Sequence, residues 1–264
     1  MIDNLRRNDS CFCGSGMKYK KCCGSRFLIH PDSLMGRLIR LYSIIDEMAA
    51  SVFKRYNFPC KEGCSDCCSK TMFAVSFIEF DYVKYGLQNM PQTDMKRLEE
   101  RVISQAEDML KKTPEVFEDL PQYSSSITTI GEWKKASWLK ERIYEKAGNM
   151  PCPLLENEKC IVYKYRPYTC RVLGPLRPSV EHLPCDLINK NALSYQMTIP
   201  TKLMPFNALG IYSVGKPLLV WLYTEIKNQQ LYTFTHSERK IVFETPASMV
   251  YYHGKPIPKS SLDQ

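Results

Sequence analysis

Cysteine is the residue type in this chain whose number and spacing point to chemistry, with twelve cysteines among 264 residues. They fall in three tight groups and nowhere else: Cys11, Cys13, Cys22 and Cys23; Cys60, Cys64, Cys67 and Cys68; Cys152, Cys160, Cys170 and Cys185. The polar start of the chain lacks the apolar core of a secretory signal, so we expect a cytoplasmic protein. Because thiols stay reduced in the cytoplasm, such clusters predict metal ligands rather than disulfides.

The first group has the composition of a small zinc knuckle. Two cysteines one residue apart and two adjacent ones are joined by an eight-residue segment, so four thiolates can converge on one ion. Zinc favours four thiolates in a tetrahedron, and a segment this short has too little core to fold without it. We therefore predict Zn²⁺ bound by Cys11, Cys13, Cys22 and Cys23.

This segment closely resembles the SEC-C motif, the zinc knuckle at the C-terminus of the SecA translocation ATPase and in many unrelated proteins. Both cysteine pairs, the turn Gly14-Ser15-Gly16 and the run Lys18-Tyr19-Lys20 carry the resemblance. It implies zinc binding and docking to a partner, in SecA the SecB chaperone and the ribosome. A zinc staple without any partner is the alternative.

The second and third groups together resemble the CxxCxxCC zinc- or iron-chelating family, also called the YkgJ-type cysteine-cluster proteins. The later segment carries most of the resemblance: Cys152, Pro153, Leu154, Cys160, Tyr163, Arg166, Pro167, Cys170 and Arg171. The earlier cluster departs from the family pattern because three residues, not two, separate Cys60 from Cys64. Whether Cys60 is a ligand therefore stays open.

Eight thiols in two segments suit either of two metal contents. They could hold two zinc ions with four thiolates each, or one [4Fe–4S] cluster with cysteines to spare. Soft thiolates disfavour calcium and magnesium. His182 could replace one ligand or lie on the surface. Arg166 and Arg171 flank Cys170, and they could offset the charge of the thiolates, form salt bridges to carboxylates, or do both.

The charge distribution bears on possible partners. The net charge is +8, and the first 26 residues hold six Lys and Arg side chains against two Asp. This basic end could attract an acidic protein or ribosomal RNA, or it could simply be solvated. No specific motif supports nucleic-acid binding. No window of about 18 apolar residues occurs, so we expect no membrane span.

Periodicity and capping signals predict the elements that position these groups. We expect helices over 34–52, from a capping box at Ser76 and Glu79 to about residue 85, over 93–112, from a second capping box at Thr129 and Glu132 to about residue 148, and over 218–227. A loop is expected over 113–127 and a strand over 240–245. Six aromatic residues favour core packing over lining a pocket: Tyr163, Tyr165, Tyr168, Tyr195, Tyr212 and Trp221.

These elements predict an α+β fold that is mostly helical and irregular and is organised by its metal sites. The expected parts are a zinc knuckle over 1–25, a connecting amphipathic helix over 26–56, and one main cysteine-cluster domain over 57–264. A helical insert over about 70–150 separates the two cysteine segments of that domain, so metal binding there should tie its halves together.

The function that fits these features best is a cytoplasmic zinc- and/or iron-binding protein with the knuckle as a docking module. Two alternatives stay open: an iron–sulfur or iron-dependent enzyme that modifies a protein or peptide, and a ribosome- or secretion-linked adaptor with structural metals. The chain lacks a GxGxxG sequence after a strand, a Walker loop, HExxH and GxSxG, so no catalytic residue is assigned.

Overall fold

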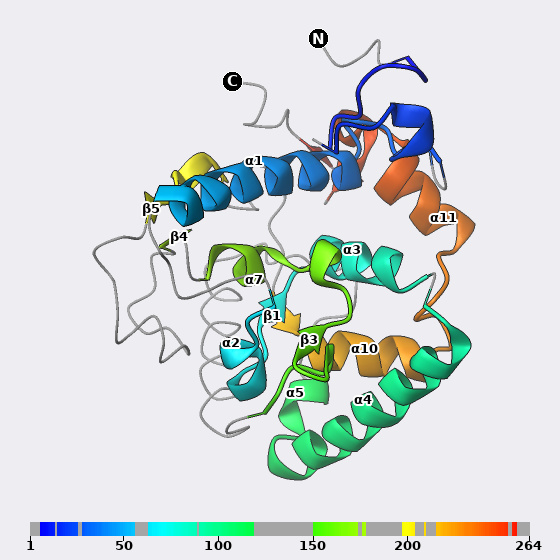
Figure 1. The fold of residues 1–264 in the computed structure, drawn as a ribbon. Coiled ribbons are helices and arrows are strands. Elements are labelled where there is room, and N and C mark those ends of the chain that lie inside the picture. Colours follow the sequence, from blue (N-terminus) through cyan, green and yellow to red (C-terminus); the bar gives the residue numbers. More distant parts are fainter. Residues whose placement is uncertain are drawn as a thin grey trace.

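The computed structural model describes residues 6–13, 15–25, 28–55, 63–88, 90–118, 150–173, 176–177, 197–203, 209, 215–252 and 255–257. Within these ranges the chain is mostly helical, with a few two-residue strands (Figure 1). None of the helices in these ranges is both long and apolar enough to span a bilayer.

The helical elements include long α-helices and single turns. The α-helices are α1 (Leu34–Arg55), α2 (Asp66–Lys70), α3 (Phe77–Leu87), α4 (Gln92–Lys112), α5 (Glu115–Glu118), α7 (Tyr168–Val172), α10 (Leu218–Lys227) and α11 (His236–Arg239). The 3₁₀ turns are η1 (Tyr19–Lys21), η2 (Tyr163–Tyr165), η4 (Thr201–Leu203) and η6 (Ala247–Met249), and η5 (Lys240–Glu244) is a π-helix.

The strands form four separate pairs. β1 (Ala74–Val75) pairs antiparallel with β6 (Lys216–Pro217), and β2 (Leu155–Glu156) with β3 (Lys159–Cys160). β4 (Leu176–Arg177) runs parallel to β5 (Met197–Thr198), and β7 (Tyr251–Tyr252) is antiparallel to β8 (Lys255–Pro256). Because each pair is so short, helix packing holds the described part of the chain together.

Helix α1 confirms the helix predicted over 34–52 and extends it to Arg55. Its apolar residues recur at three- and four-residue spacing, so one face is buried. Ser33 caps the first turn, since its hydroxyl accepts a hydrogen bond from the backbone N–H of Gly36 at 3.1 Å.

Two hydrophobic clusters form the core of the described residues. The first joins α1 to the N-terminal cysteine segment, to α7 and to Val242 and Phe243. The second packs α4 and α10 around the other face of α3, where Phe80 stacks on Trp221 with ring centroids 5.4 Å apart. Helix α3 contributes side chains to both clusters and so lies between them.

Three more predicted helices are confirmed, and a fourth lies outside the described residues. Helix α3 begins with the predicted capping box of Ser76 and Glu79 and ends at Leu87. Helices α4 and α10 match the predictions over 93–112 and 218–227. The helix predicted from Thr129 lies outside the described residues.

Two local predictions were wrong. Residues 240–244 form the π-helix η5 rather than a strand, because Thr235 and Glu238 cap α11 and η5 continues it in helical geometry. The expected loop over 113–127 contains the helical turn α5 at residues 115–118, and its other described residues, 113–114, are not helical.

Candidate metal centres

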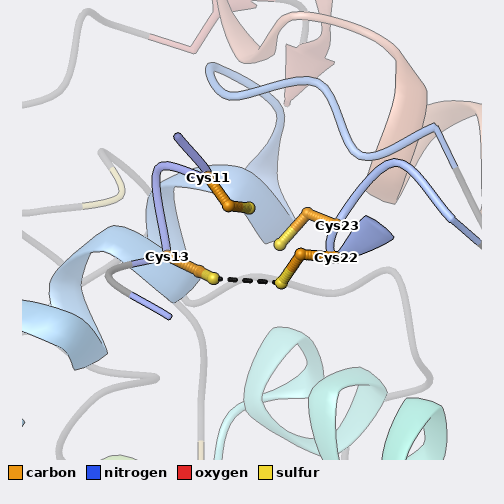
Figure 2. A group of neighbouring side chains, drawn as sticks. All are labelled: Cys11, Cys13, Cys22 and Cys23. Carbon is orange, nitrogen blue, oxygen red and sulfur yellow. Dashed lines mark hydrogen bonds between the residues drawn. The ribbon is translucent and has the colours of Figure 1, made fainter. Parts of the chain in front are cut away.

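The four thiols of the N-terminal segment converge on one point. Their sulfur atoms all lie within 4.8 Å of one another, and the Sγ atoms of Cys13 and Cys22 are 3.4 Å apart (Figure 2). Tetrahedral zinc with Zn–S bonds of about 2.3 Å holds its sulfur atoms about 3.8 Å apart. The four residues therefore fit a zinc ion with little adjustment.

The local backbone explains this convergence. The N–H of Cys11 donates to the carbonyl of Met17 at 2.8 Å, and Ser10 bridges to Lys18, so the segment folds back on itself. The turn includes Gly16 at φ +70°, a conformation that favours glycine. The 3₁₀ turn η1 directly precedes Cys22 and Cys23 and places them close to Cys11 and Cys13.

Hydrogen bonding and burial within this group shift the pKa values of three of its thiols. The pKa of Cys13 is lowered to about 4, chiefly by a hydrogen bond from Cys23. The pKa of Cys23 is raised, chiefly because its proton is held in that bond, and burial raises the pKa of Cys22. The Cys13 thiolate is thus stabilised by the Cys23 thiol, whereas a bound cation would favour the thiolate form of its ligands.

The structure also brings the two later cysteine segments together. Cys67 and Cys68 lie on helix α2 with their Sγ atoms 4.0 Å apart. The N–H of Cys152 donates to the carbonyl of Cys68 at 2.7 Å, which joins segments about 84 residues apart in sequence. The β2–β3 hairpin carries Cys160, and α7 carries Cys170 just after Pro167.

The thiols of these segments interact electrostatically. Burial raises the pKa of Cys152 to about 12, and the neighbouring Cys160 and Cys67 thiols contribute to the rise. Burial also raises the pKa of Cys170 well above its usual value, with further contributions from Cys152, Cys160 and Cys67. Four thiols from both segments therefore share one low-dielectric region.

Not every predicted ligand can be placed. Cys60, Cys185 and the alternative ligand His182 lie outside the described residues, and Cys64 lies just before α2. Among the described residues, the only group whose ligand atoms all lie within 4.8 Å of one another is the N-terminal one. The assignment of the remaining cysteines as ligands stays a prediction.

Comparison with known families matches this division of the cysteines. A model of the SEC-C motif matches residues 7–25, and a model of the CxxCxxCC family, described as "Putative zinc- or iron-chelating domain", matches residues 59–186. The chain is thus similar to the SEC-C motif over residues 7–25 and to the CxxCxxCC domain over residues 59–186. Both predicted resemblances are confirmed, and the eight later cysteines all lie within the CxxCxxCC match. No curated protein sequence and no solved structure matches the chain.

The two arginines beside Cys170 in the CxxCxxCC domain both lie against Asp46 of α1. Arg171 is paired with Asp46 of α1 and donates to the carbonyls of Arg166 at 2.9 Å and Lys164 at 2.7 Å. Arg166 lies 3.8 Å from the carboxylate of Asp46, and its guanidinium partly offsets the rise in the pKa of Cys170 that burial causes. Salt bridging and charge compensation of the thiols therefore coexist.

A cavity of about 580 Å³ lies between the SEC-C motif, α1, α3 and the CxxCxxCC domain. Of the predicted aromatic set, Tyr165 lines it, whereas Tyr168 and Trp221 are buried in the core. The Arg166 guanidinium lies 4.0 Å from the centre of the Tyr163 ring. Tyr195 and Tyr212 lie outside the described residues.

The sequence analysis missed three other tyrosines of this cavity: Tyr42, Tyr82 and Tyr85. Their helical spacing on α1 and α3 marks them as inward-facing, but it does not show that the two helices meet there. The sequence pattern therefore indicated a buried helix face, but it did not indicate a pocket.

Proposed function

We propose that the protein is a cytoplasmic metal-binding protein with a zinc ion in the SEC-C motif and zinc or iron in the CxxCxxCC domain. The single observation that carries this proposal is the convergence of Cys11, Cys13, Cys22 and Cys23 within 4.8 Å. An all-sulfur, four-ligand site suits structural zinc, because no coordination position is left open for a substrate. The Ser15 hydroxyl, 3.2 Å from the Cys22 sulfur, supports that thiolate from outside the ligand set.

In the CxxCxxCC domain the proposed ligands come from the two later cysteine groups. They are Cys60, Cys64, Cys67, Cys68, Cys152, Cys160, Cys170 and Cys185. Support comes from the contact between Cys68 and Cys152 and from the mutual effect of the thiols on their pKa values. The nearby Arg166 guanidinium is suited to either an anionic zinc thiolate centre or an iron–sulfur cluster.

Anaerobic purification with metal analysis and a visible spectrum tests the proposal. If every site holds zinc, the protein is colourless and contains about three ions per chain, one for each set of four thiolates. Brown protein with iron and sulfide would instead support the iron–sulfur alternative for the CxxCxxCC domain.

Two serine variants separate the sites. Cys170→Ser should lower the metal content of the CxxCxxCC domain and leave the SEC-C zinc, whereas Cys22→Ser should do the reverse. Unchanged metal content in both variants would overturn the proposal.

A docking role for the SEC-C motif is a second proposal, supported by its charge. Lys18, Lys20 and Lys21 are all exposed beside the metal site, and no salt bridge occupies them within the described residues. An acidic partner, including the ribosome surface, fits such a cluster.

Co-sedimentation of the full chain with ribosomes tests this role. A triple Lys→Glu variant at these positions should lose binding, and the matched variant Lys111→Glu/Lys112→Glu at the end of α4 should keep it. Binding that survives the triple variant would rule out docking through the SEC-C motif.

A further inference from the structure

The cavity beside the SEC-C motif distinguishes among its four thiols. Cys13, Cys22 and Cys23 line the cavity, and Cys11 does not. Cys13 and Cys22 are half-buried, whereas Cys11 and Cys23 are only 5% and 7% exposed. Two of the four chemically similar thiols therefore both line the cavity and are more accessible than Cys11 and Cys23.

The size and walls of this cavity suit a small molecule. Its volume of about 580 Å³ lies within the range of small-molecule pockets. On the α1 side, the exposed residues Glu47 and Ala50 line it, and the floor includes Tyr82 and Tyr165. Neither phenol hydroxyl of these two tyrosines has a hydrogen-bond partner among the described residues, so both remain available to a bound molecule.

We infer that Cys13 and Cys22 form a covalent modification site for small alkylating electrophiles that enter through this cavity. The nucleophile is the thiolate, which forms when the thiol proton passes to solvent or is already present as a metal ligand. Its lone pair forms the new S–C bond while the bond from that carbon to its leaving group breaks, and the leaving group departs as an anion with the bonding electrons. The product is an uncharged thioether, which is a poorer ligand for a cation than the thiolate it replaces.

The position of the site gives the modification a structural consequence. Cys11 and Cys23 pack in the same core cluster as Tyr19 and the buried face of α1. Disruption of the four-thiol group by alkylation at Cys13 or Cys22 would therefore disturb that core. This inference goes beyond the proposed metal binding, because it concerns which thiols react.

Iodoacetamide is a suitable probe for the intact chain in its metal-loaded form. The first carbamidomethyl group should appear on Cys22 or Cys13 roughly tenfold faster than on Cys11, because thiol modification follows exposure. Mass spectrometry of the singly modified protein measures this before a second alkylation occurs. Equal or faster reaction of Cys11 would overturn the inference.

A pair of tryptophan variants on α1 tests the route. Ala50→Trp places a large ring at the cavity wall and should slow modification of Cys13 and Cys22 several-fold. Ser51→Trp is the matched control, since Ser51 is exposed on the same helix and does not line the cavity. If both variants react like the wild type, the cavity is not the route. If Ala50→Trp fails to fold, Glu47→Trp replaces it in the test, because Glu47 lines the same side of the cavity.

Metal analysis of the same samples keeps this test separate from the proposed function. A protein that binds no metal but still reacts first at Cys13 or Cys22 would sink the metal proposal and support the modification site. A protein with the expected metal content and no preference among its SEC-C thiols would support the metal proposal and overturn the modification site.

Discussion

Glu79 is a buried carboxylate that connects three helices through its hydrogen bonds. It accepts bonds from the Tyr42 hydroxyl at 3.1 Å, from the Tyr168 backbone N–H at 2.8 Å, and from the N–H and hydroxyl of Ser76 at 3.0 and 2.7 Å. A buried carboxylate needs hydrogen-bond partners, and these four donors supply them. One side chain thus fixes α1 and α7 to the start of α3.

Replacement of this carboxylate by an amide should destabilise the fold. In Glu79→Gln the new NH₂ group faces donors, so we expect a loss of about 1–3 kcal/mol in the free energy of unfolding. Urea denaturation measures the loss. Glu100→Gln, at an exposed position on α4, is the control and should change stability little. Equal stability of the two variants would contradict the role given to Glu79.

Asp46 is the charge partner of a guanidinium that lies almost fully inside the protein. The Arg171 side chain is 3% exposed, stacks at 4.2 Å from the centre of the Tyr42 ring, and ends on Asp46. The carboxylate itself is 45% exposed, so solvent screening weakens the pair.

Asp46→Asn removes that charge and leaves Arg171 without its anionic partner. We expect a loss of about 1–2 kcal/mol, at the low end for a charged hydrogen bond because of the screening. Thermal or urea unfolding gives the value. Asp108→Asn breaks the exposed pair with Lys112 and should cost under about 0.5 kcal/mol. If the two losses are the same, the buried guanidinium does not depend on Asp46.

Two glycines allow helices to approach the neighbouring chain closely. A Cβ atom on Gly36 of α1 would lie 2.2 Å from the carbonyl oxygen of His30 and 2.5 Å from that of Pro31. A Cβ atom on Gly86 of α3 would lie 2.4 Å from the Tyr165 ring. Both positions therefore require the absence of a side chain, although alanine is a better helix former.

Gly36→Ala should accordingly destabilise the protein by about 1–3 kcal/mol, the usual cost of overpacking. The clash is with backbone atoms, which cannot rotate away. Ser51→Ala, on the same helix but exposed, controls for helix propensity and should stay within about 0.5 kcal/mol of wild type. A stabilised Gly36→Ala protein would show that helix propensity outweighs the close approach.

The elements that were predictable are those whose signal is local. The long helices α1, α4 and α10 carry repeated apolar positions, and α3 carries a capping box in its first four residues. The run Ile241-Val242-Phe243 has strand-like side chains, but its position directly after α11 decided its conformation. The cavity was not predictable, because it depends on contacts between segments far apart in sequence.

The SEC-C motif is part of the main core of the described chain. Cys11, Tyr19 and Cys23 pack in one cluster with α1, α7 and Phe243. The Tyr19 hydroxyl donates to the carbonyl of Ile29 at 2.8 Å, and the N–H of His30 donates to that of Phe243 at 2.7 Å. Loss of a metal ion held by the four cysteines would therefore affect more than the motif.

Cys22→Ser should lower the melting temperature of the whole chain in one transition. A shared core couples the motif to α1, and cooperative unfolding follows from that coupling. Circular dichroism against temperature, after both proteins are incubated with the same excess of zinc, measures the shift. Ser25→Ala, at an exposed position in the same segment, should leave the transition in place. A separate early transition with an unchanged main one would show that the motif unfolds alone.

The whole molecule should respond oppositely to pH with and without metal. In the metal-free fold the pKa of Cys152 is raised to about 12, above its usual value near 8.5 in an unfolded chain. Between these values the folded state retains a proton that the unfolded state has lost. The contribution of this thiol to the free energy of unfolding is therefore complete below about pH 8.5, and it is lost as the pH rises toward 12.

The metal-loaded protein should instead lose stability in acid, since bound thiolates must be deprotonated and protons compete with the ion. Melting temperatures from pH 5 to 10 should thus fall toward alkaline pH for the metal-free chain and toward acid for the loaded one. Cys152→Ser removes the raised thiol and should flatten the alkaline limb of the metal-free curve. Parallel curves for the loaded and metal-free wild type would mean that these thiols hold no metal.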